Sequence, residues 1–379
     1  MKPFRLSRRR LLASGLAAGS LPALRQAGER EGGEEVPWLA DVQHPPRQLP
    51  GDAPRLSPLL VDGSGRPITS LSAWQQRRGQ IRRWWLDFLK PLRTERTGPP
   101  AFRVLAEDRP EGAVRQLVRY EVEPGEPCEA YVLKPAKPGP RCPAAVVLHS
   151  TVDQTIRQPA GVEGPPETAF GLKLAGLGYV TICPRNFLWP TDGKSFDGRQ
   201  VERFARRHPG SKGMAKMLYD AQVALDILVA IPEVDANRLA AIGHSLGAKE
   251  VLYLAALDER VKVAVSSEGG IGTAFSNWDA AWYLGPEIHQ KTFTHEHHEL
   301  LALVAPRAFL LLGGDSADGD RSWPFIEAVL PVYKLYGPPD QPAVGARYPA
   351  RVGLLNHKKR HSVPVEAERA IYEWLRAYC

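Results

Sequence analysis

The chain has 379 residues, of which 43% are hydrophobic and 24% are charged. This composition is that of a globular protein with a sizeable core, and it excludes a disordered or fibrous chain. The formal net charge is +7, but residues 1–27 hold six basic residues and no acidic one, which leaves +1 for the rest. The basic excess therefore belongs to the N-terminus and argues against nucleic-acid binding. No apolar run is long enough for a permanent membrane anchor.

The first 27 residues are predicted to be a Tat-type signal peptide. Residues 7–12 read Ser-Arg-Arg-Arg-Leu-Leu, which is similar to the twin-arginine signature, and a weakly hydrophobic stretch follows to residue 24. A basic segment before a short apolar one is typical of a cleavable export signal. We therefore expect the Tat translocon as a partner during export and a periplasmic or secreted protein. Four cysteines are too few for a disulfide framework, so free thiols are expected.

The rest of the chain divides into an arm and one large domain. Residues 28–71 form a Pro/Gly-rich N-terminal arm, in which Trp38 and Leu39 are expected to dock on the body. From residue 72 to 379 we expect an α/β-hydrolase domain, because a helix and a strand pair are followed by alternating strands and helices. The strands are predicted at 114–135 (two), 144–148, 179–183, 239–243, 261–266, 306–312 and 351–355, and the helices at 72–89, 167–177, 214–231, 246–257, 323–336 and 365–378.

This alternation predicts a doubly wound, mostly parallel sheet with flanking helices, the α/β-hydrolase fold class. Two stretches interrupt it, at residues 187–210 and 273–297, and each follows a strand end. Ligand sites in α/β sheets lie at that edge, so we expect lid-like loop insertions or substrate walls there. Trp278, in the second insertion, is a candidate for stacking on a sugar ring.

Ser245 is the candidate nucleophile. Residues 239–247 read as a short apolar strand that runs into Gly-His-Ser-Leu-Gly, and a predicted helix follows. This strand–turn–helix context is the one in which a Gly-x-Ser-x-Gly serine is exposed on a strained turn. The N–H of Leu246 would then stabilise an oxyanion, and Thr151, after the strand that ends at residue 148, would supply the second N–H group.

A serine hydroxyl needs a base and a supporting carboxylate. His361, which precedes the last helix, is the preferred base, and His357 is the rival. For the acid, Asp318 and Asp315 follow the strand at 306–312, while Glu268 ends the strand before it, and the sequence leaves the three open. No cofactor is expected. No metal is expected either, because the histidines in residues 295–299 lack zinc-binding spacing.

These residues resemble the α/β-hydrolase superfamily serine esterases of the dienelactone hydrolase and acetylxylan-esterase type, with echoes of the glucuronoyl methylesterase family, over residues 140–376. Residues 245–249 (Ser-Leu-Gly-Ala-Lys) are similar to that last family's Ser-Arg-x-Gly-Lys, and residues 298–307 match its His-Glu-Leu-x-Ala-Leu-x-Ala-Pro-Arg run. The resemblance implies that Lys249 contacts uronic-acid hydroxyls and that either Glu268 or Asp318 is the triad acid. Leu246 departs from the family's arginine.

The function expected from these features is that of an exported serine hydrolase of carboxylic esters. The ester substrate, a small molecule or a polysaccharide, is expected to be carbohydrate-linked, with an acetyl or uronoyl acyl group that forms an acyl-enzyme. A secreted serine peptidase or amidase of the same fold is the first alternative. A non-catalytic carbohydrate-binding protein is the second, and the ordered set of nucleophile, acid and base argues against it.

Overall fold

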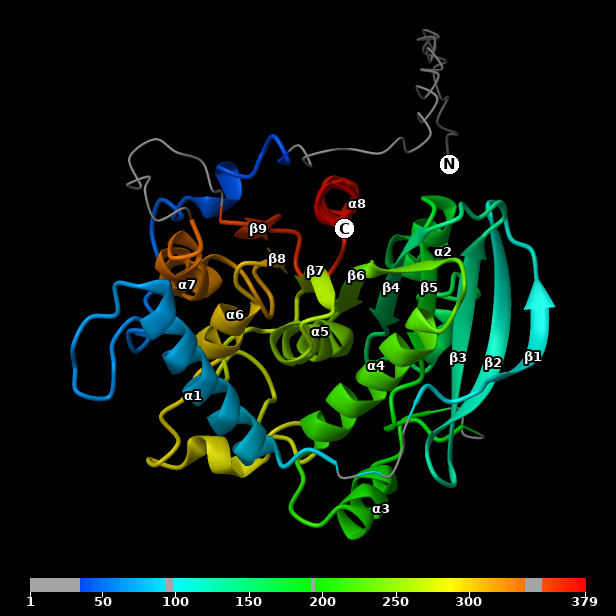
Figure 1. The fold of residues 1–379 in the computed structure, drawn as a ribbon, viewed down its shortest axis with the longest axis horizontal. Helices are drawn as coiled ribbons and strands as arrows, with labels where there is room; N and C mark the ends of the chain where they lie inside the picture. The colour runs from blue at the N-terminus through cyan, green and yellow to red at the C-terminus, as the bar shows by residue number, and fades with distance from the viewer. Residues whose placement is uncertain (1–34, 93, 95–97, 192–194, 338–349) are drawn as a thin grey trace, which may run out of the picture. The chain divides into compact units, whose positions relative to one another are not determined.

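A nine-stranded mixed sheet is the centre of the computed structural model, which describes residues 35–92, 94, 98–191, 195–337 and 350–379 (Figure 1). The strand order is β1-β2-β3-β5-β4-β6-β7-β8-β9. The three strands at one edge are antiparallel, as is the pairing of β3 with β5, and all pairings from β5 to β9 are parallel. The strands are β1 (Arg103–Asp108), β2 (Ala113–Glu123), β3 (Glu126–Pro135), β4 (Cys142–Leu148), β5 (Val180–Pro184), β6 (Val234–His244), β7 (Val261–Ser267), β8 (Ala308–Gly313) and β9 (Val352–Asn356).

Helices cover both faces of this sheet. On β4, Ala144 and Val146 belong to the larger core, whereas Ala145 and Val147 belong to the smaller core on the other face. This alternation explains why β4 is apolar throughout. The larger core contains α1 (Leu71–Leu89), α4 (Gly213–Val229), α5 (Leu246–Leu257), α6 (His298–Val304) and α7 (Trp323–Lys334), and the smaller one contains α2 (Phe170–Gly176) and α8 (Val365–Tyr378).

The described part of the N-terminal arm packs on β9 and α8. Trp38 stacks on Trp374 of α8 with 5.7 Å between ring centroids, and Leu39 is buried. The side-chain amide of Gln43 donates to the carbonyl oxygen of Val352 in β9 at 2.8 Å. These contacts confirm that Trp38 and Leu39 dock on the body. Residues 1–27, the predicted signal peptide, lie outside the described residues.

The predicted helices 246–257 and 365–378 have the bounds of α5 and α8. The edge strand β1 was missed, because all six of its residues are exposed and no apolar alternation marks it. All four cysteines are unpaired in the structure. Within the described ranges, no helix is both long and apolar enough to cross a membrane.

Candidate active site

Ser245 occupies a strained turn between β6 and α5. Its backbone has φ 59° and ψ −115°, which is unfavourable for a residue with a side chain. The turn is held because the Ser245 N–H donates to the carbonyl oxygen of Ser267 in β7 at 2.8 Å. Such a turn exposes the serine side chain at the carboxyl edge of the sheet, beside the first turn of α5. The predicted strand–turn–helix arrangement is therefore present.

The two glycines of the motif let strand and helix approach each other. A Cβ atom on Gly243 would lie 2.3 Å from the carbonyl carbon of Gly247, and a Cβ on Gly247 would lie 2.2 Å from the carbonyl oxygen of Leu148. We expect Gly247→Ala to lower the free energy of unfolding by about 2 kcal/mol or more, because backbone rather than a mobile side chain must shift. Urea denaturation measures this loss. Gly176→Ala, at a helical glycine with no atom within 4 Å of the added Cβ, is the matched control, and equal stabilities of the two variants would contradict the prediction.

His361 and Glu268 form the second part of the site. His361 lies in the loop between β9 and α8, and its Nδ1 is 3.4 Å from Oε2 of Glu268. Glu268 follows β7 with φ 56° and is 1% exposed. Its carboxylate also accepts hydrogen bonds from the N–H groups of Gly314 and Ala317, the latter at 2.7 Å. A carboxylate fixed in this way can orient an imidazole and stabilise its charged form.

Asp318, the other leading acid candidate, makes different contacts. Its carboxylate accepts hydrogen bonds from the N–H groups of Gly270 at 2.7 Å and Ile271 at 2.8 Å, and from the hydroxyl of Ser322 at 2.8 Å. Burial raises its pKa above the usual value of a carboxyl group. Asp318 thus fixes the loop that follows Glu268. Asp315, the third candidate, accepts a hydrogen bond from the Asn356 side chain at 2.7 Å.

Two further histidines surround His361. His244, within the nucleophile motif, places its ring 4.6 Å from that of His361, and its Nδ1 lies 3.0 Å from the Ser267 hydroxyl. Sequence reasoning did not single out His244, although its position next to the nucleophile was visible. Burial lowers its pKa to about 3, so it stays neutral beside the base. His357, the rival base, accepts a hydrogen bond at Nδ1 from the Lys359 N–H, 3.1 Å away.

The predicted oxyanion donors lie in the same cavity as Ser245. This cavity is lined by Ser245, His361, Leu246 and Thr151, among others. In the described part of the chain, the N–H groups of Leu246 and Thr151 have no hydrogen-bond partner. They are therefore available to a negatively charged oxygen.

Both predicted insertions supply walls of this catalytic cavity. The first insertion contributes Leu188 and Phe196, and the second contributes Ser276, Asn277, Trp282 and Tyr283. Phe196 and Trp282 pack edge to face, with 5.5 Å between ring centroids. The two segments, which are about 90 residues apart in the sequence, thus meet beside Ser245.

Lys249 lines the cavity without an ion-pair or hydrogen-bond partner among the described residues. It is 4% exposed, and its Nζ lies 4.0 Å from the ring centroid of Trp278 and 5.2 Å from that of Tyr283. Trp278 is 1% exposed and donates its indole N–H to the Gly270 carbonyl oxygen at 2.7 Å. The Trp278 ring therefore packs against the Lys249 side chain. Because the ring is buried, it has no exposed face on which a sugar could stack.

The buried ammonium group predicts a pH dependence of stability. Burial lowers the pKa of Lys249 from 10.5 to about 7, so between these values the unfolded chain binds a proton that the folded chain does not. Stability must then rise with pH across this window, whereas below it the destabilisation caused by Lys249 is largest and no longer changes with pH. We expect the free energy of unfolding of the wild type, relative to Lys249→Met, to increase by about 1–3 kcal/mol between pH 7 and pH 10. Denaturant titrations at several pH values measure the difference. A constant difference would contradict the assigned burial.

The histidine-rich segment 295–299 is structural. His295 stacks on Trp84 with 3.4 Å between centroids and hydrogen-bonds Glu299 at 2.6 Å, while His298 contacts the Ser57 carbonyl oxygen. Within the described ranges, no cluster of three or more histidine, cysteine or acidic side chains has an arrangement that could hold a metal ion.

Comparisons with known proteins place part of the chain near one enzyme family. Residues 128–304 match the model of the dienelactone hydrolase family. A Bacillus subtilis protein described as a hydrolase, YtaP, is 29% identical over 219 residues, which cover 55% of this chain and 71% of that protein.

Two solved structures share the fold. A glucuronoyl esterase from Solibacter usitatus matches with a TM-score of 0.65 and 18% identity, over 87% of this chain and 98% of that one. An acetyl xylan esterase from Paenibacillus sp. R4 matches with a TM-score of 0.52 and 16% identity, over 91% and 100%. Residues 128–304 are therefore similar to the dienelactone hydrolase family, and the chain has the α/β-hydrolase fold.

Proposed function

We propose that this protein is an exported serine esterase that cleaves carbohydrate-linked carboxylic esters. One observation carries the proposal: Ser245 on its strained turn and His361, paired with Glu268, line the same cavity. A serine becomes a nucleophile when a base accepts its proton and a carboxylate orients the base. The arrangement therefore supports acyl transfer through Ser245.

The reaction proceeds in two halves. Ser245 Oγ attacks the ester carbonyl carbon while His361 accepts the hydroxyl proton, and the N–H groups of Leu246 and Thr151 stabilise the oxyanion. The tetrahedral intermediate collapses, the bond to the alcohol oxygen breaks, and His361 returns its proton to that oxygen. Water, deprotonated by His361, then attacks the acyl-enzyme and releases the acid and free Ser245.

The substrate assignment is supported by the cavity and by the comparisons. Lys249 lines the cavity beside Ser245, and the resemblance to the glucuronoyl methylesterases implies a lysine here that contacts uronic-acid hydroxyls. The similar solved structures include glucuronoyl and acetyl xylan esterases. Leu246, where the glucuronoyl family has arginine, makes an acetyl ester the second candidate. Initial rates on acetylated xylan, glucuronate methyl esters, p-nitrophenyl esters and p-nitroanilides test this assignment. Turnover of the anilides alone would contradict the esterase assignment and indicate a peptidase or amidase.

The proposal that the protein is exported rests on the sequence of residues 1–27. Their fusion to a reporter that folds before transport should place the reporter outside the cytoplasm, and replacement of Arg8, Arg9 and Arg10 by lysine should abolish transport. Equal transport of both fusions would refute Tat export without affecting the esterase proposal.

A further inference from the structure

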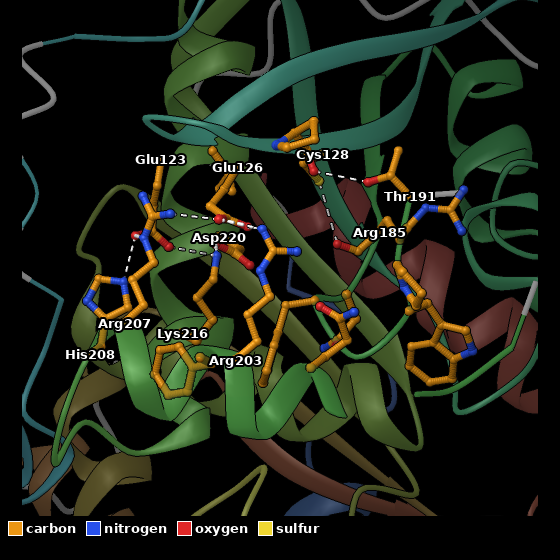
Figure 2. Close-up of a pocket in the computed structure, with 18 residues that line it drawn as sticks. Glu123, Glu126, Cys128, Arg185, Thr191, Arg203, Arg207, His208, Lys216 and Asp220 are labelled. Atoms are coloured by element: carbon orange, nitrogen blue, oxygen red, sulfur yellow. Dashed lines mark hydrogen bonds and ion pairs between the residues drawn. The ribbon is translucent and has the colours of Figure 1, made fainter. Parts of the chain in front are cut away.

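A second cavity lies next to the catalytic one, and we call it the side cavity (Figure 2). It is lined by the tip of the β2–β3 hairpin, the segment 185–191 after β5, the helix α3 (Arg199–Arg207) and the beginning of α4. The empty space within it, open solvent at its mouth included, is about 750 Å³. The triad does not use any of its residues.

Successive residues of one segment line the two cavities. Asn186, Phe187 and Trp189 line the side cavity, whereas Leu188, between them, lines the catalytic cavity. Trp189 also packs edge to face on Phe196 of the catalytic cavity, with 5.8 Å between centroids. The two cavities are therefore neighbours on opposite sides of the segment 186–189.

The charges of the side cavity are compensated internally. Lys216 bridges Asp220 and Glu123, and the Arg203 guanidinium lies 2.7 Å from the Glu126 carboxylate (Figure 2). The other basic lining residues also have carboxylate partners, namely Arg207 and His208 with Glu123 and Arg185 with Glu129. No bound anion is required to balance these cations, so a neutral ligand fits best.

The remaining lining groups suit a neutral polyhydroxylated ring. Phe187 and Phe204, with 5.6 Å between centroids, offer apolar surface to the C–H face of such a ring. The side-chain amide of Gln200 has no hydrogen-bond partner among the described residues and can both donate and accept. A hydroxyl group of a sugar in the cavity would satisfy this amide.

We propose that the side cavity is a subsite for a neutral pyranose unit of the glycan whose ester group reacts at Ser245. This inference rests on the proposed function for its link to catalysis. The side cavity contributes affinity and selects polymeric over monomeric esters, because only a chain of several sugars reaches it from the catalytic cavity.

A double variant on α3 tests the subsite. Gln200→Ala/Arg203→Ala removes two polar lining groups, and Glu126 keeps Arg207 as its partner at 2.6 Å. Arg206→Ala is the matched control, since Arg206 is on the same helix, has a side chain 73% exposed and does not line the side cavity. We expect the ratio of kcat/KM for acetylated xylo-oligosaccharides to kcat/KM for p-nitrophenyl acetate to fall about tenfold in the double variant and to stay unchanged in Arg206→Ala. An unchanged ratio in the double variant overturns the proposal.

A direct binding experiment separates failure of the subsite from failure of the esterase proposal. Calorimetric titration of the wild type with xylotetraose, cellotetraose and mannotetraose, which carry no ester, requires no catalysis. At least one should bind, about tenfold more weakly to the double variant and equally to Arg206→Ala. This result supports the subsite even if no ester is hydrolysed. Absence of binding by all three at millimolar concentration, or equal affinity of the double variant, overturns it.

Discussion

Replacement of Ser245 by alanine is expected to lower kcat for ester hydrolysis by at least about a thousandfold, with the fold unchanged. A serine triad acts as a unit, so removal of the nucleophile leaves only the oxyanion donors and substrate binding to accelerate the reaction. The alanine side chain is smaller and removes only the hydroxyl group. Thermal denaturation should therefore show a variant at least as stable as the wild type, because the φ of 59° at this position is unfavourable for both residues.

Labelling with a fluorophosphonate identifies the nucleophile independently of any substrate. In the wild type, mass spectrometry of the digested protein should place the adduct on the peptide that contains Ser245, and Ser245→Ala should not react. An adduct on another serine, or turnover of the alanine variant at the wild-type rate, would show that the nucleophile is misassigned.

The second large effect is expected at the acid. Glu268→Gln keeps the size of the side chain but removes its charge, and its amide can present an N–H to Nδ1 of His361 and favour the wrong tautomer. We expect kcat to fall about a thousandfold. Asp318→Asn keeps one acceptor for the N–H groups of Gly270 and Ile271, so it should lower stability and reduce kcat less than tenfold.

Steady-state rates and denaturant midpoints of the two variants, measured together, distinguish the roles. A collapse of kcat in Asp318→Asn alone, with both variants folded, would make Asp318 the triad acid. Loss of activity in both, without loss of stability in Asp318→Asn, would contradict the role given to Asp318 as a support of the loop after Glu268.

The turn that carries the proposed nucleophile could be predicted because it is determined locally. A strand, two small residues and a helix determine the turn at Ser245, and all of them are contiguous in the sequence. The acid could not be predicted in this way. Glu268 and Asp318 follow neighbouring parallel strands, so both carboxylates come to the same sheet edge, and only the backbone at Glu268, with φ 56°, directs one of them to His361.

The burial of Lys249 could not be predicted from the sequence either. On a helical pattern, a lysine near the start of α5 is expected at the surface. The second insertion covers this end of α5, and places Trp278 and Tyr283 against the Lys249 side chain. Such contacts join segments about 30 residues apart, and no local periodicity encodes them.

The docking of the arm has a consequence for the order in which the site forms. His361 lies between β9 and α8, and residues 35–43 pack on these same two elements. The loop that carries the base is thus held by contacts that span more than 300 residues, and such long-range contacts form late in folding. A growing chain would contain the turn at Ser245 and the Glu268 carboxylate well before contacts with the arm could hold His361, the proposed base. The enzyme would therefore remain inactive during synthesis until the strand and helix that flank His361 had joined the arm.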